Sequence, residues 1–171
     1  MSHGGSLIVT LGISGSGKSR YSKEMESKGF IRVCMDDLRK LYTGSISDQT
    51  QNHRVADTAF AIAEFLLLKE KDVIFDSTAT NAGTRNKLLK MAREQGASTE
   101  LVVFMDSKNF QLCQDRVNKD LKSGIDRADT TKEDSIMARQ YSAFMDSLKA
   151  IDKEGWDDIT KIGVSENHGG Y

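Results

Sequence analysis

The sequence predicts an α/β fold in which helices cover both faces of a parallel sheet. Short apolar segments alternate with longer amphipathic ones along the chain, a pattern typical of parallel strands joined by helical crossovers. Two of the apolar segments, 73–75 and 101–105, are uninterrupted, as in strands that are buried on both faces. The length of 171 residues, with 38% apolar and 29% charged residues, indicates a single domain with a sizeable core.

The first half of the chain begins with a strand and a glycine-rich loop. The predicted elements are a strand at 7–11, a helix at 19–28 that stops at Gly29, a strand at 30–34, a short helix from 36 to 41 and a turn at 43–47. Asp48 is expected to cap a long helix that runs to about Leu68. The broad apolar face of that helix predicts close packing against the sheet.

The second half continues the alternation. We expect a strand at 73–75, a helix at about 82–95 ended by Gly96, a strand at 101–105, a helix from about 109, a polar stretch at 119–132, a helix at about 132–148 and a possible fifth strand at 158–162. The expected strand order is 2-3-1-4, with the fifth strand beside the fourth. Residues 165–171 are expected to form a frayed tail.

A complete phosphate-binding motif follows the first strand. Residues 12–19 match GxxxxGK[ST], and the motif lies between a strand and a helix, as its mechanism requires. Glycines let successive N–H groups point at phosphate oxygens, and the following helix adds its positive dipole end. Lys18 is predicted to bind the β- and γ-phosphates of ATP or another NTP, and Ser19 to bind Mg²⁺. The other predicted nucleotide-binding residues of this P-loop are Gly12, Ser14, Gly15, Ser16 and Gly17.

The segment after the second strand favours a kinase over other P-loop proteins. Asp36 and Asp37 stand at the carboxyl end of a parallel strand, where open α/β sheets bind ligands. One carboxylate could accept the proton of an attacking hydroxyl, and Arg39 could hold a substrate phosphate. The alternative is that one aspartate only caps the next helix. The chain is short for a motor domain and lacks an NKxD-type guanine-reading segment.

Three segments together resemble a known family. The P-loop, Asp-Asp-x-Arg at 36–39 and Phe-Asp-Ser-Thr at 75–78 look like the kinase domain of bacteriophage-type 5′-hydroxyl polynucleotide kinases. These belong to a wider group that includes zeta-toxin-like and small-metabolite P-loop kinases. The resemblance extends from residue 7 to about 148 and implies a three-layer α/β/α fold with a helical lid.

The resemblance also implies roles for individual residues. Asp36 would be the general base on the 5′-hydroxyl, and Arg39 would bind the 3′-phosphate of the acceptor nucleotide. Asp76 would serve the acceptor or the magnesium shell, with Thr78 near the acceptor phosphate. Asp106, after the strand at 101–105, competes with Asp76 for the magnesium role.

The implied lid, at about 115–132, departs from the family pattern. Arg116 resembles its first arginine, but Asp120 or Lys122 falls where a second arginine is expected. The candidates for neutralising the triphosphate are therefore Arg116, Lys122 and Arg127, and a solvated charged loop is the alternative.

Charge and composition limit the partners only weakly. The net charge of -1 neither indicates nor excludes a nucleic-acid substrate. The leading prediction is phosphoryl transfer from ATP to the 5′-hydroxyl end of DNA or RNA. The alternatives are a hydroxymethylated base in DNA, a nucleotide or small-metabolite hydroxyl, or a nucleotide-dependent switch without an acceptor. We expect a cytoplasmic protein with reduced cysteines and no membrane segment.

Overall fold

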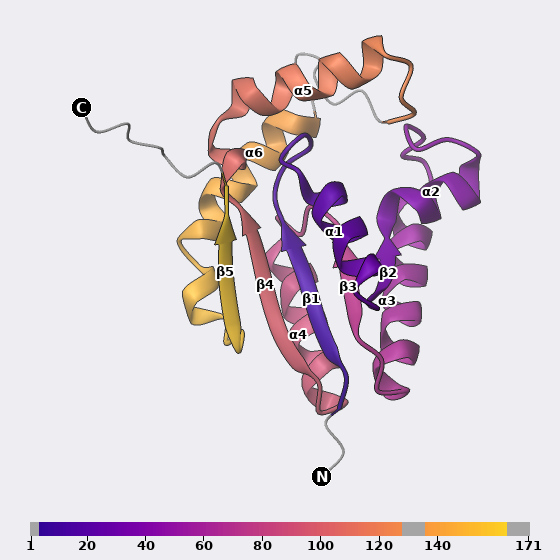
Figure 1. Ribbon diagram of the computed structural model, residues 1–171, viewed down its shortest axis with the longest axis vertical. Helices are drawn as coiled ribbons and strands as arrows, with labels where there is room; N and C mark the ends of the chain where they lie inside the picture. The colour runs from indigo at the N-terminus through magenta and orange to yellow at the C-terminus, as the bar shows by residue number, and fades with distance from the viewer. Residues whose placement is uncertain (1–3, 128–135, 164–171) are drawn as a thin grey trace.

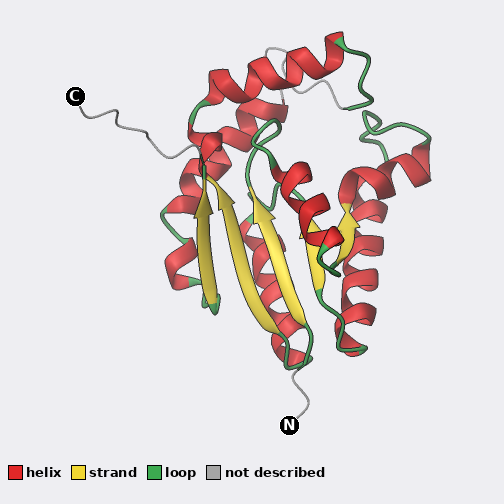
Figure 2. Ribbon diagram, viewed as in Figure 1, coloured by secondary structure: helices red, strands yellow, loops and turns green. Residues whose placement is uncertain are grey.

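A computed structural model describes residues 4–127 and 136–163 of the chain (Figures 1 and 2). Its sheet contains five strands in the order β2-β3-β1-β4-β5, all of them parallel. The strands are β1 (Ser6–Leu11), β2 (Ile31–Cys34), β3 (Val73–Asp76), β4 (Ser98–Phe104) and β5 (Asp158–Ile162). The predicted strand order is confirmed, and the fifth strand lies beside the fourth.

The helices cover both faces of the sheet. They are α1 (Lys18–Ser27), α2 (Met35–Thr43), α3 (Asn52–Leu68), α4 (Ala82–Glu94), α5 (Phe110–Lys122) and α6 (Ile136–Leu148), with short 3₁₀ segments η1 (Met105–Lys108) and η2 (Ile151–Lys153). The larger core joins α3, α4 and α6 to one face, and the smaller core joins α1 to the other. Figure 1 shows α5 across the carboxyl edge of the strands.

The register places three functional segments at that edge. In the middle of the sheet β1 pairs with both β3 and β4, with Val9 opposite Phe75 and Leu101. Cys34, the last residue of β2, lies opposite Asp76, the last residue of β3. Since parallel strands end at a common edge, the P-loop and the segments after β2 and β3 converge there.

Some predicted boundaries are wrong. Asp48 does not cap α3, whose N-cap is Gln51. The Asp48 carboxylate instead accepts hydrogen bonds from the N–H and hydroxyl of Thr50, at 2.9 and 2.6 Å. Asp competes for such local turns as readily as for a helix end. Neither Asp36 nor Asp37 is the N-cap of α2, which is Cys34, so both lie in the first helical turn.

Two further element boundaries differ from the predicted ones. β4 begins three residues earlier than predicted, at Ser98, because Thr99 forms hydrogen bonds with Asp157 at the end of the neighbouring connection. The polar stretch from 119 is helical as far as Lys122. Residues 128–132 of the predicted lid and the predicted tail at 165–171 lie outside the described residues. In the described part of the chain, no helix combines the length and apolar character needed to cross a membrane.

Candidate nucleotide and acceptor site

A cavity of about 500 Å³ lies at the carboxyl edge of the sheet, between the P-loop, α2, the β3–α4 turn and α5. Its lining contains most of the predicted site residues. They are Ser14, Gly15, Ser16, Gly17, Lys18, Ser19, Asp36, Asp76, Thr78, Asp106, Arg116 and Arg127, together with Arg20, Cys34, Ser77 and Asp120. Gly12, Arg39 and Lys122 were also predicted but are not part of this lining.

The P-loop has the backbone conformation that a phosphate cradle requires. Gly15 and Gly17 have φ angles of 80° and 101°, in the left-handed region that favours glycine. The N–H groups of Gly15, Gly17, Lys18 and Ser19 donate to no acceptor among the described residues. They lie at the start of α1, where unpaired N–H groups and the helix dipole attract anions.

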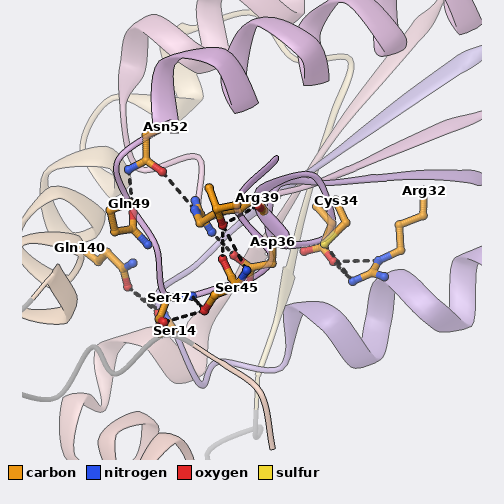
Figure 3. Close-up of polar contacts among 12 residues, drawn as sticks. Ser14, Arg32, Cys34, Asp36, Arg39, Ser45, Ser47, Gln49, Asn52 and Gln140 are labelled. Carbon is orange, nitrogen blue, oxygen red and sulfur yellow. Dashed lines mark hydrogen bonds and ion pairs between the residues drawn. The ribbon is translucent and has the colours of Figure 1, made fainter. Parts of the chain in front are cut away.

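The rest of the loop is held by contacts from distant segments. The N–H groups of Gly12, Ile13 and Ser14 donate to Thr78 O, Ser107 Oγ and Gln140 Oε1, each at 3.0 Å. The Ser14 hydroxyl donates to the same Gln140 oxygen at 3.0 Å, as Figure 3 shows. These contacts fix the loop from three sides, while its phosphate-binding N–H groups remain available.

Lys18 lies among charges of both signs. Its ammonium donates to the Ile13 carbonyl at 2.7 Å. Burial lowers the pKa of Lys18, the carboxylates of Asp76 and Asp36 raise it, and Arg127 lowers it again, with a net decrease. Lys18 therefore lies within electrostatic reach of the predicted acceptor residues and of the segment after α5.

Asp36 is presented to the cavity by a buried arginine. Its side chain is 54% exposed, whereas that of Arg39 is 10% exposed. Arg39 donates from Nη1 to Asp36 Oδ1 and from Nε to Asn52 Oδ1 at 3.0 Å, so it joins α2 to the start of α3 (Figure 3). This arrangement leaves Asp36 oriented and accessible, as a general base must be.

Asp76 is more enclosed than the sequence suggested. Its side chain is 5% exposed, and Oδ2 accepts hydrogen bonds from Arg32 Nε and Nη2, at 2.9 and 2.6 Å. Arg32 also donates to Asp37 Oδ2 at 3.3 Å. Arg32 was missed in the sequence, although a charged residue inside a parallel strand signals a buried partner.

The lid arginines are paired with acids at the other side of the cavity. Arg116 Nη1 donates to Asp106 Oδ2 at 2.8 Å and to the Gly15 carbonyl at 3.1 Å. Arg127 forms an ion pair with Asp120, one of the two residues (with Lys122) that fall where a second lid arginine was expected. Lys122 is exposed at the end of α5. The structure thus gathers Arg116 and Arg127 around the P-loop and leaves Lys122 outside.

Comparisons with protein families and with solved structures identify the family and the fold. The family model AAA_33, described as an AAA domain, matches residues 7–141. The chain belongs to the AAA_33 family. No curated protein matches the chain in sequence. The match covers the P-loop, both acidic strand ends and α5, which line the cavity, and it ends in the first half of α6, at residue 141.

Solved structures share the fold of this AAA_33 protein. A chain of the Pnkp1/Rnl/Hen1 complex is 25% identical, with a TM-score of 0.54, over 61% of this chain and 36% of that one, so the match spans little more than a third of that protein. A chain of the Pnkp1/Rnl/Hen1 RNA repair complex is 15% identical, with a TM-score of 0.54, over 99% and 83%. The Mycobacterium tuberculosis APS kinase CysC, in complex with AMPPNP and APS, is 20% identical, with a TM-score of 0.53, over 85% and 98%.

The described residues fit a magnesium ion held mainly by a nucleotide. Mg²⁺ in phosphoryl-transfer sites keeps several waters and takes few protein ligands. Ser19 lines the cavity, and its hydroxyl forms no hydrogen bond within the described ranges. Over the same residues, no three His, Cys, Asp or Glu side chains gather as a metal site. One Asp76 oxygen is already occupied by Arg32.

Both cysteines are buried and free. Burial raises the pKa of the Cys34 thiol to about 12 and that of Cys113 to about 11. A thiol that stays protonated is a poor nucleophile. Although Cys34 lines the cavity, the chemistry there belongs to carboxylates, cations and backbone N–H groups.

Proposed function

We propose that this AAA_33 protein is a kinase that transfers the γ-phosphoryl group of ATP to the 5′-hydroxyl of a polynucleotide. The observation that carries the proposal is the position of Asp36, half-exposed in the same cavity as the P-loop and held by Arg39. The similarity to chains of the Pnkp1/Rnl/Hen1 complexes supports a nucleic-acid acceptor.

The proposed roles follow the two ends of the cavity. The N–H groups of the P-loop and Lys18 bind the β- and γ-phosphates, and Arg116 and Arg127 neutralise charge that develops on the transferred group. Ser19 and Asp76 would hold Mg²⁺, which supplies positive charge to the phosphate oxygens. Because catalysis of this reaction is mostly positioning and electrostatics, the contacts that fix the P-loop belong to the machinery.

The acceptor end performs the proton transfer. The 5′-oxygen forms a bond to the γ-phosphorus, the bond from that phosphorus to the β–γ bridging oxygen breaks, and ADP leaves with the electron pair. Asp36 takes the proton of the hydroxyl. Arg39 orients Asp36. Its proposed contact with an acceptor 3′-phosphate would use the N–H groups that bind neither Asp36 nor Asn52, although its side chain is only 10% exposed and does not line the cavity. Thr78 lies on the same side of the cavity.

A small hydroxyl-bearing acceptor is the second candidate. Lys40 of α2 forms an ion pair with Asp126, after α5, at 3.0 Å, so the chain crosses the cavity from the lid to the acceptor side. At Asp120, one of the two positions where a second lid arginine is expected, the chain carries an anion. Both features favour a compact acceptor over a long polyanion, and the fold is shared with an APS kinase.

The decisive experiment compares two neighbouring aspartates. Transfer of label from γ-labelled ATP to a 5′-hydroxyl oligonucleotide is measured for the wild type, Asp36→Asn and Asp37→Asn. Asp36→Asn should lower kcat by about 10²–10⁴-fold with ATP affinity retained, since it removes the general base. Asp37→Asn should stay within a few fold, because the Asp37 side chain is 69% exposed, does not line the cavity and forms only a long ion pair with Arg32, at 3.3 Å.

Each failure has a distinct meaning. If Asp36→Asn turns over as fast as Asp37→Asn, Asp36 is not the base. If the protein binds ATP but labels no oligonucleotide, the polynucleotide acceptor is wrong, and small hydroxyl compounds are the next acceptors to test.

A further inference from the structure

A second cavity, of about 130 Å³, lies between α3 and the β3–α4 turn. It meets the nucleotide cavity at Ser77 and Thr78, which line both. Met35, which also lines it, directly precedes Asp36. The second cavity is therefore a side pocket on the acceptor side of the site; we call it the α3 pocket.

The walls of the α3 pocket are apolar and aromatic. Phe75, at its base, is buried, and Phe60 stacks on it with ring centroids 5.7 Å apart and an interplanar angle of 16°. Lys87 Nζ lies 4.1 Å from the Phe60 ring centroid, which helps to hold this ring in place. The thioether of Met35 and the aromatic faces offer dispersion contacts to a flat ring.

The rim of the α3 pocket is polar, and its groups are not used by the fold. The hydroxyls of Thr78, Thr80 and Thr84 form no hydrogen bond to any described residue, and neither does Asn81 Nδ2. The Ser77 hydroxyl is enclosed and also lacks a partner in the described part of the chain. Enclosed polar groups are normally satisfied, so a ring with donors and acceptors on its edge fits better than a hydrocarbon.

The volume selects one ring over two. A cavity of roughly 150 Å³ in a protein core holds a benzene molecule. At about 130 Å³ the α3 pocket has the size of a single six-membered ring, so the second ring of a purine would project from its open side. Among nucleobases, this distinguishes pyrimidines from purines.

One face of α3 contributes both to the α3 pocket and to the contacts that orient the general base, Asp36. Asn52, Ala56 and Phe60 are spaced by four residues, which places them on the same side of the helix. Asn52 binds Arg39, which orients Asp36, whereas Ala56 and Phe60 line the pocket. A ring in the pocket would therefore sit beside the carboxylate that receives the acceptor proton.

We propose that the α3 pocket binds the pyrimidine ring of the acceptor's terminal nucleotide and makes the enzyme prefer 5′-terminal pyrimidines. This inference rests on the proposed polynucleotide kinase function. Ala56 and Thr84 then determine specificity without taking part in phosphoryl transfer.

Binding is tested without turnover. Met35 supplies a methyl NMR probe in the pocket, and Met145 of α6 supplies a reference. Thymidine at millimolar concentration should shift the Met35 signal, and adenosine should shift it much less. Ala56→Leu, which fills the pocket, should abolish the thymidine shift. If adenosine and thymidine shift Met35 equally, or if thymidine shifts it as much in Ala56→Leu, the inference is overturned.

Transfer kinetics test the same pocket by another route. Oligonucleotides that differ only in the first base should show a kcat/KM preference for pyrimidine of roughly tenfold, the size that pocket complementarity commonly gives. Ala56→Leu should reduce this preference to near one with ATP affinity unchanged. Thr84→Val, which keeps the shape and removes a rim hydroxyl, should reduce it partially and provides a second variant if Ala56→Leu does not fold.

The outcomes separate the two proposals. Labelling of all oligonucleotides without base preference would refute the pocket inference and keep the kinase function. A selective thymidine shift at Met35 with no oligonucleotide labelled would refute the polynucleotide acceptor and keep a pyrimidine-ring site.

Discussion

Two buried arginine–carboxylate pairs flank the β3–α4 turn. One of them packs against the core, and the other lies beside the nucleotide cavity. Arg85 and Glu154 are 1% and 9% exposed and lie on the core side, where Arg85 Nη1 also donates to the Ala79 carbonyl at 2.8 Å. Arg32 and Asp76 are 10% and 5% exposed, but Asp76 lines the nucleotide cavity beside Lys18. Burial alone therefore does not distinguish a structural ion pair from a functional one. The distinguishing feature is whether the pair borders a cavity that can hold a ligand.

The core pair supports an unusual backbone. Ala79 has a φ of 46°, in the left-handed region that non-glycine residues rarely adopt. Arg85 binds the Ala79 carbonyl, and Ser147 Oγ donates to the Thr80 carbonyl at 3.0 Å. Since Thr78 O accepts the N–H of Gly12, this network shapes both the turn and the first P-loop residue.

The largest expected effect is on stability, from Arg85→Met. It would leave Glu154 buried without its cation, which costs about 3–5 kcal/mol of unfolding free energy. Urea unfolding followed by circular dichroism measures the loss. Arg93→Met is the matched control, because Arg93 contacts the same segment at the Gly155 carbonyl, at 2.7 Å, but near the surface, and it should cost about 1 kcal/mol. Equal losses would remove the distinction between core and surface contacts.

Arg32→Met is expected to affect activity more than stability. Asp76 would lose its orientation beside the reacting groups, so phosphoryl transfer should fall by about 10²-fold. The unfolding free energy should fall by less than in Arg85→Met, because Lys18 and cavity water can compensate the freed carboxylate. Transfer assays and urea unfolding on the same preparations measure both. If Arg32→Met were as unstable as Arg85→Met but fully active, the Arg32–Asp76 pair would be structural and not functional.

Acid should weaken the core pair. Burial raises the pKa of Glu154, but hydrogen bonds from Arg85 and Trp156 lower it further, to below its ordinary value. The pair therefore stabilises the fold fully above the unfolded pKa of about 4.3, and this contribution is lost as the pH falls through the folded pKa. Glu154→Gln should reduce the slope of stability against pH below about pH 4.3 by up to about 1.4 kcal/mol per unit. Urea midpoints across this range test it, and an unchanged slope would contradict the assignment.

The smallest effect on stability and ATP affinity is expected from the uncharged hydrogen bond between Gln140 and Ser14. Gln140→Met keeps the length of the side chain but removes the acceptor for Ser14, which costs about 1 kcal/mol. ATP affinity should fall by up to about tenfold, because the P-loop is less fixed. Gln140→Glu keeps the acceptor but adds charge near the phosphates, so it should lose more ATP affinity and less stability. Calorimetric titration with ATP distinguishes the two variants, and equal affinities would argue against this role.

Local and contiguous signals were predictable from the sequence, whereas pairings across the sheet were not. The P-loop could be found because eight consecutive residues, 12–19, carry its chemistry. The strand order agreed because the alternation of elements constrains a parallel sheet. Gln140 could not be found, because 126 positions separate it from Ser14 and an amide on an amphipathic helix carries no signal of its contact.

The functional carboxylates were predictable in position but not in environment. Asp36 and Asp76 follow strands, and the common edge of parallel strands brought them into one cavity. Their partners depend on register and helix packing: Arg32 lies on the neighbouring strand, and Asn52 begins a helix whose start was assigned to Asp48. The Asp120–Arg127 pair joins residues seven positions apart around the end of α5, where sequence periodicity gives no guidance.

The contact between Gly15 and α5 limits how the helix could move. A Cβ on Gly15 would lie 2.3 Å from the Cys113 carbonyl oxygen, so the first half of α5 is pressed against the P-loop backbone. Arg116, one turn further on, binds the Gly15 carbonyl. The first half of α5 and the P-loop are thus held together by direct contacts. Any opening of the cavity that keeps these contacts must bend α5 beyond Arg116, and its hinge would lie within the helix rather than at Asn109.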